Sequence, residues 1–71
     1  MAAMEETHLE QADRHIAEAE QHIANQEQRI STLDAAGYDT TEGRRLLAAF
    51  RDTLEQMLIH RRLIIARIGA A

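Results

Sequence analysis

Three histidines recur at intervals of seven residues in the N-terminal half of the chain. His8, His15 and His22 each precede an aliphatic residue, and a fourth histidine, His60, lies in the C-terminal half. Imidazoles bind metal ions and change charge near neutral pH, so the row raises the question of a metal site or a pH-sensitive surface. Residues seven apart on a helix are about 10.5 Å apart along its axis. No two members of the row can therefore share a metal ion, because zinc–nitrogen bonds are about 2.0–2.1 Å long.

His15 and His60 form the one pair that escapes this objection, provided that the chain folds back on itself. The same fold would bring His8 opposite Arg67. Two imidazoles supply only two of the four ligands of a structural zinc, so Glu18 or a carboxylate of a neighbouring chain would have to complete the site. We therefore predict no metal and no cofactor, with the histidines flanking a packing stripe and their nitrogens in water. His15 and His60 define the alternative, a metal-responsive or pH-responsive pair.

Composition restricts the other classes of function. The 71 residues include no cysteine. Twelve acidic and eight basic residues give a net charge of −4, and all eight basic residues are arginine. There is no glycine-rich phosphate loop and no serine or cysteine nucleophile with a base at motif spacing, so we predict no catalytic residues and no enzyme. The acidic balance argues against nucleic acid, and no signal peptide or membrane span is visible, so we expect a cytoplasmic protein. Membrane-surface or nucleic-acid binding through the arginines of "HRRLIIAR", residues 60–67, is the least favoured hypothesis.

The elements that position the histidines are two long helices with one turn between them. Gly37 suits the left-handed position that ends a helix, and Asp39 followed by Glu42 has the spacing of a capping box. We predict helices at about 4–36 and about 40–68, with the turn at 37–39, as one domain covering residues 1–71. We expect Tyr38 to fold back over the end of the hairpin rather than stand exposed.

A seven-residue repeat marks the packing face of the first helix. Its members are Leu9, Ile16, Ile23 and Ile30, with Ala12, Ala19, Gln26 and Leu33 between them. The matching stripe of the second helix is Leu47, Phe50, Leu54, Met57, Arg61, Ile64 and Ile68. A short connection predicts antiparallel neighbours, an all-α, coiled-coil-like hairpin. One consistent register places Ile16 opposite Met57 and Ile23 opposite Phe50. We expect Gln26 and Arg61 to extend their polar ends to the surface.

Apolar residues remain outside this stripe. They are Leu46, Leu58, Ile59, Leu63 and Ile65. The alanine-rich face of the first helix cannot cover them, and contiguous apolar patches usually mark association surfaces. We therefore predict an oligomer interface here and favour a homodimer of hairpins that forms a four-helix bundle.

The segment "LDAAGYDTTEGRRLLAAFRDTLEQMLIHRRLIIARI" resembles a group of short, largely uncharacterised bacterial proteins. In that group a Gly-x-Asp-Thr-x-x-Ala turn joins two long helices, followed by a Leu-Leu pair and a terminal His-Arg segment. The matching positions here are Gly37, Asp39, Thr40, Leu46, Leu47, His60 and Arg61, and the resemblance spans about residues 8–68. Gly43 stands where the group more often has alanine. The resemblance implies a helical hairpin and no activity.

Taken together, the sequence favours a non-enzymatic, homo-oligomeric helical protein. Its expected role is protein–protein interaction, as a small regulatory or adaptor module with a protein partner that the sequence does not identify. The metal-responsive or pH-responsive bundle is the second hypothesis.

Overall fold

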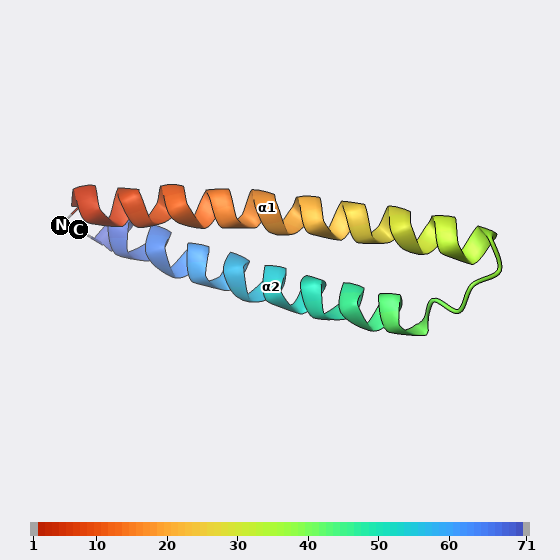
Figure 1. The fold of residues 1–71 in the computed structure, drawn as a ribbon. Helices are drawn as coiled ribbons and strands as arrows, with labels where there is room; N and C mark the ends of the chain where they lie inside the picture. Colours follow the sequence, from red (N-terminus) through yellow and green to blue (C-terminus); the bar gives the residue numbers. More distant parts are fainter. Residues whose placement is uncertain (1, 71) are drawn as a thin grey trace.

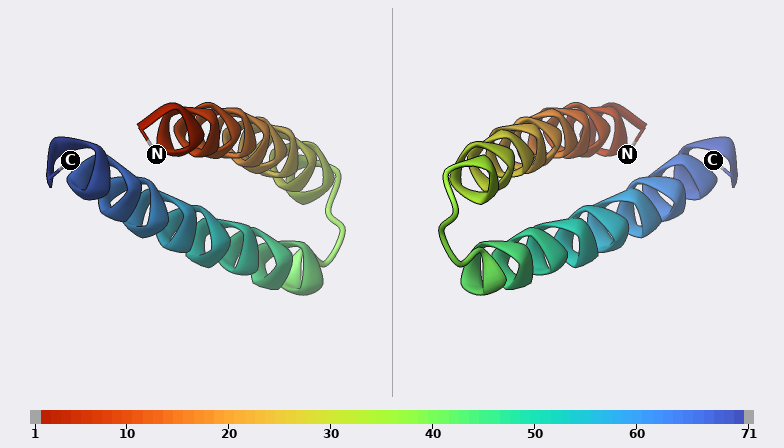
Figure 2. Two further views of the ribbon diagram at one scale, coloured as in Figure 1. Left: turned by 90° about the vertical axis from the view of Figure 1, so that its left-hand side faces the viewer. Right: turned by 90° about the vertical axis from the view of Figure 1, so that its right-hand side faces the viewer.

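The protein folds as a helical hairpin. The structure is a computed structural model, which describes the backbone of residues 2–70 and the side chains of residues 7–70. Helix α1 spans Ala2–Ala35 and α2 spans Thr41–Ala70. They lie side by side and antiparallel, so both ends of the chain lie at the same end of the hairpin (Figure 1), and they twist around each other (Figure 2). The molecule measures 54 × 14 × 12 Å. The predicted all-α hairpin is confirmed, with helix boundaries within two residues of those expected.

The two predicted stripes form the core between the helices. In α1 the stripe is buried or half-buried at Leu9, Ala12, Ile16, Ala19, Ile23, Gln26 and Ile30. Its last member, Leu33, is 37% exposed. In α2 every predicted member is buried or half-buried, and Thr40 and Gly43 extend the stripe to the turn. Ile64, at 1% exposure, is the most deeply buried large side chain that the structure describes. Small α1 side chains thus face large α2 side chains, which allows close packing.

Gly37 ends α1 in the left-handed conformation, with φ of 84°. The backbone N–H of Gly37 donates to the carbonyl of Asp34, and that of Tyr38 donates to the carbonyl of Leu33, both at 3.0 Å. These two bonds form a Schellman motif, which satisfies carbonyls left unpaired at the end of the helix. Tyr38 itself is 65% exposed. The expectation that it folds back over the hairpin end is wrong, because a side chain leaving this tight turn points into solvent.

Helix α2 begins with a different cap from the predicted capping box. The Asp39 carboxylate accepts hydrogen bonds from the backbone N–H of Thr41 at 2.9 Å and from its hydroxyl at 2.7 Å. These bonds, chiefly the one from the hydroxyl, lower the pKa of Asp39 below its usual value. Glu42 instead pairs with Arg45 at 2.8 Å. The carbonyl of Thr40 accepts the first helical bond, so the helix starts one residue later than a box on Asp39 requires.

Gln26 is buried rather than extended to the surface, contrary to the sequence expectation. It is 7% exposed, and its Nε2 donates to the backbone carbonyl of Gly43 at 3.0 Å. A Cβ at Gly43 would lie 3.3 Å from that nitrogen and 3.3 Å from Cγ1 of Ile30. Glycine at this position therefore lets the helices come close enough for the amide to bond across the interface.

Ion pairs join the helices along one edge of the interface. Asp13 pairs with Arg61, Glu27 with Arg51 at 3.0 Å and Asp34 with Arg44 at 3.7 Å. The charged end of Arg61 thus reaches solvent, as predicted for it. All six side chains are more than one-third exposed, so each pair contributes about 1 kcal/mol at most. Their role is to favour one register of the two helices over its neighbours.

Replacing Gly37 by alanine is expected to lower the free energy of unfolding by about 1–2 kcal/mol, because a Cβ is disfavoured in the left-handed conformation. Urea denaturation followed by circular dichroism measures the loss. The matched control is Gly69→Ala, in the last turn of α2, where an added Cβ meets open space. That variant should be as stable as the parent or slightly more so. A Gly37→Ala protein of parental stability would show that the turn does not need this conformation.

Replacing Gln26 by glutamate keeps the shape of the side chain but puts a carboxylate oxygen against the Gly43 carbonyl. The loss of the hydrogen-bond donor and the burial of the charge should lower the free energy of unfolding by about 1–3 kcal/mol at neutral pH. The deficit relative to the parent should shrink as the pH falls towards about 4, because a protonated carboxyl can donate again. Gln28→Glu, an exposed substitution of the same type, should change stability by less than about 0.5 kcal/mol. Equal stability of both variants at pH 7 would contradict a buried Gln26.

Candidate functional site

The four histidines lie along one side of the hairpin, opposite the edge with the ion pairs. His15 and His22 line a hollow between the helices, and His15 also lines a second hollow together with His8 and His60. Because His15 belongs to both hollows, the imidazoles form one continuous row, which we call the histidine face. Its members are exposed, as predicted for residues that flank the core.

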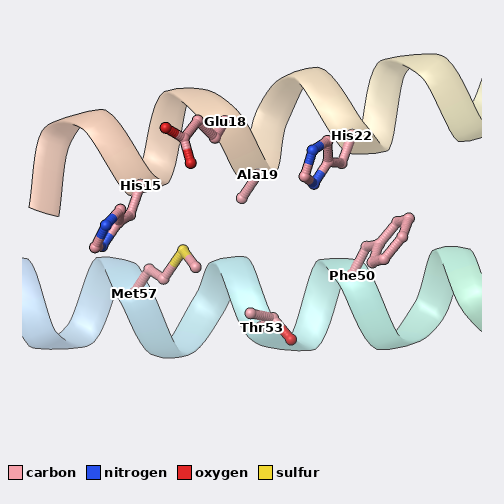
Figure 3. A pocket seen from close by; sticks show the side chains of 7 residues that line it. All are labelled: His15, Glu18, Ala19, His22, Phe50, Thr53 and Met57. Carbon is pink, nitrogen blue, oxygen red and sulfur yellow. The ribbon is translucent and has the colours of Figure 1, made fainter.

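The first hollow has an apolar floor and a volume of about 290 Å³. Figure 3 shows His15 extending from α1 towards α2 near Met57, and the short side chain of Ala19 between His15 and His22. The His22 and Phe50 rings have centroids 6.0 Å apart and planes tilted by 42°, within the usual range for aromatic pairs. The alanine leaves the space that the hollow occupies, since a larger residue there would fill it. Glu18 and Thr53 also line this hollow.

The second hollow contains the cross-helix neighbours expected from the sequence. His15 and His60 both line it, as do His8 and Arg67. No carboxylate lines it among the side chains that the structure describes, so Glu18 is not placed to complete a metal site with His15 and His60. Over residues 7–70, no three histidine or acidic side chains are grouped to hold one ion.

Exposed aliphatic side chains gather on α2. Leu58 and Ile59 are each 39% exposed, Ile65 42% and Leu63 55%. These four residues, within two turns of each other, are called the outer apolar surface below. Leu46 is 45% exposed but lies more than two turns earlier and lines a hollow with His22 and Phe50. The structure therefore separates Leu46, which lies beside the histidine face, from the other four residues of the predicted interface.

Sequence reasoning missed the edge of ion pairs and the contact between His22 and Phe50. A signal for the first was present, because Asp13, Glu20, Glu27 and Asp34 are spaced by seven residues and so are Arg44 and Arg51. Such acidic and basic ladders are what antiparallel helices present to each other beside the core. The aromatic contact depends on side-chain direction, which spacing alone does not give.

Comparisons of the chain with protein-family models, with curated proteins and with solved structures found no significant match. The resemblance to bacterial hairpin proteins therefore stays a prediction. Neither helix, over the residues described, contains a segment long and apolar enough to cross a membrane. The site has to be interpreted from its own geometry.

Micromolar zinc is expected to leave the thermal melt unchanged, because no three histidine or acidic side chains within residues 7–70 are grouped to hold one ion. A site occupied at about 100 times its dissociation constant would stabilise the fold by about 2.7 kcal/mol. Melts with zinc and after chelation measure the difference. A reversible rise of several degrees, lost in both His15→Ala and His60→Ala but kept in His22→Ala, would contradict this prediction and establish a metal site.

Proposed function

We propose that this protein is a non-enzymatic, homo-oligomeric helical hairpin that serves as a protein–protein interaction module, with a dimer as the favoured assembly. The observation that carries the proposal is the outer apolar surface of α2. Aliphatic side chains exposed within two turns of one helix are costly to leave in water, and such patches usually mark association surfaces. The lack of cysteine supports a cytoplasmic location.

The exposed area of the chain supports the same conclusion. A compact monomer of 8.0 kDa exposes about 4,500 Å², whereas this hairpin exposes 5425 Å². The excess is comparable to the ~800 Å² that each partner contributes to a standard protein interface. A single pair of helices also has only one packing interface and no second layer. A second hairpin would cover the outer apolar surface that the first leaves exposed.

A four-helix bundle with α2 near its centre is the assembly that we favour. In this arrangement α2 buries its core stripe against α1 and its outer apolar surface against a second hairpin. The α1 surface, which is rich in charged and amide side chains, remains in water. This division of the two helices accounts for the wide apolar arc of α2 and the narrow one of α1.

The histidine face supports a second candidate function, a pH-responsive surface. His8, His15 and His60 line one hollow with Arg67 and with no carboxylate among the described side chains. Protonation of these imidazoles would place several positive charges side by side. Acidification would then weaken packing at this end of the hairpin or attract an acidic partner. We rank this pH-responsive function second, because exposed charged side chains repel each other only weakly through water.

Association predicts that the melting temperature rises with protein concentration. Ile65→Glu or Leu58→Glu should reduce association strongly, because a charge would be buried without a partner. Sedimentation velocity across a range of micromolar concentrations measures the assembly state. Gln28→Glu, on the exposed side of α1, is the control and should sediment like the parent. A parent protein that stays monomeric, with a cooperative melt independent of concentration, would overturn the proposed function.

A further inference from the structure

Eight of the nine charged residues of α2 fall into two groups, and the ninth, Arg67, lines the hollow with His60. Residues of the first group form ion pairs within the hairpin. Arg44, Arg51 and Arg61 pair with acidic residues of α1, and Glu42 pairs with Arg45. Asp52, Glu55 and Arg62 form the second group. These three side chains are exposed and make no ion pair with any side chain that the structure describes.

The unused charges flank the middle of the outer apolar surface. Glu55 lies three residues before Leu58, and Arg62 lies three residues after Ile59. Residues 52, 55, 59 and 62 follow each other at spacings of three and four, so they share one face of the helix. The core positions of α2, which include Leu54, Met57 and Arg61, are on another face. Acidic charge thus precedes the exposed aliphatic residues and basic charge follows them on the same surface.

We infer that this surface binds a second copy of itself, with the two α2 helices antiparallel and a twofold axis passing between Leu58 and Ile59. In this arrangement Glu55 of each copy lies beside Arg62 of the other, and the aliphatic side chains meet at the centre. A parallel pair would place like charges beside each other. The contact is self-complementary, as a twofold interface requires, and opposite charges at such an interface select orientation and partner.

The ends of the same face fit this register. Ala48 precedes Glu55 by seven residues, and Gly69 follows Arg62 by seven, so all four occupy one line along α2. The twofold axis places Ala48 of one copy opposite Gly69 of the other. Both residues are exposed, and a Cβ at Gly69 would meet open space, so nothing in the hairpin covers this position. Small residues at both ends let the two backbones approach closely.

This inference rests on the proposed function, because it names the partner and the orientation of the proposed association. It adds that charge decides how the copies pair. Two reversed-charge variants test it, Glu55→Arg and Arg62→Glu. In either variant alone, two attractive contacts per dimer become repulsive, and we expect self-association to weaken by on the order of tenfold or more.

Mixing the two variants should restore association. Each chain then offers the charge that the other lacks, so a mixed pair has both contacts attractive. Native mass spectrometry of an equimolar mixture should show a mixed dimer in clear excess over either homodimer. The double variant Glu55→Arg/Arg62→Glu should dimerise like the parent, which separates charge pairing from damage to the fold. Glu10→Arg and Arg14→Glu, exposed on α1, are the matched controls and should associate like the parent.

Two results would overturn the inference. If both single variants associate as strongly as the parent, or if their mixture gives no excess of mixed dimer, the antiparallel α2 contact is wrong. The proposed function would then survive, provided that the parent still associates in a concentration-dependent way. A parent that never associates would instead remove the proposed function and this inference together.

Discussion

The whole structure depends on a single seam, the contact between the α1 stripe of alternating aliphatic and small residues and the α2 stripe of larger ones. Ala12 and Ala19 bring the helix backbones close, and Ile64 fills the space most completely. A hairpin has no other layer to share this burial, so the seam carries nearly all of the hydrophobic stabilisation. Gln26 can bond to the Gly43 carbonyl only because the seam is tight there.

The two edges of the seam differ in their chemistry. One edge carries three acidic side chains of α1 paired with three arginines of α2, which disfavours a slip of one helix along the other. The other edge carries the histidines, whose rings cover hollows left by small α1 residues.

Periodicity was sufficient to predict the hairpin, both stripes and the glycine that ends α1, because each reflects a repeated or strongly constrained backbone position. It was insufficient for three details. Gln26 is buried because Gly43 exposes a carbonyl opposite it, and that depends on the register of two distant segments. The cap on α2 uses Thr41 rather than Glu42, a choice between neighbouring hydrogen bonds of similar strength. Tyr38 is exposed because the tight turn offers it no surface to cover.

The arrangement also separates association from the chemistry of the imidazoles. The outer apolar surface begins at the ion-paired edge of the seam, because Leu58 and Ile65 follow Arg51 by seven and fourteen residues, whereas the histidines border the other edge. If two hairpins join through that outer surface, as we propose, the histidine face of each copy remains accessible to solvent. Protonation there would act on the packing within one hairpin and would reach the dimer contact only through α2. The hairpin thus carries two surfaces of different chemistry, because the outer apolar surface with its flanking charges belongs to α2 alone, whereas side chains of both helices build the histidine face.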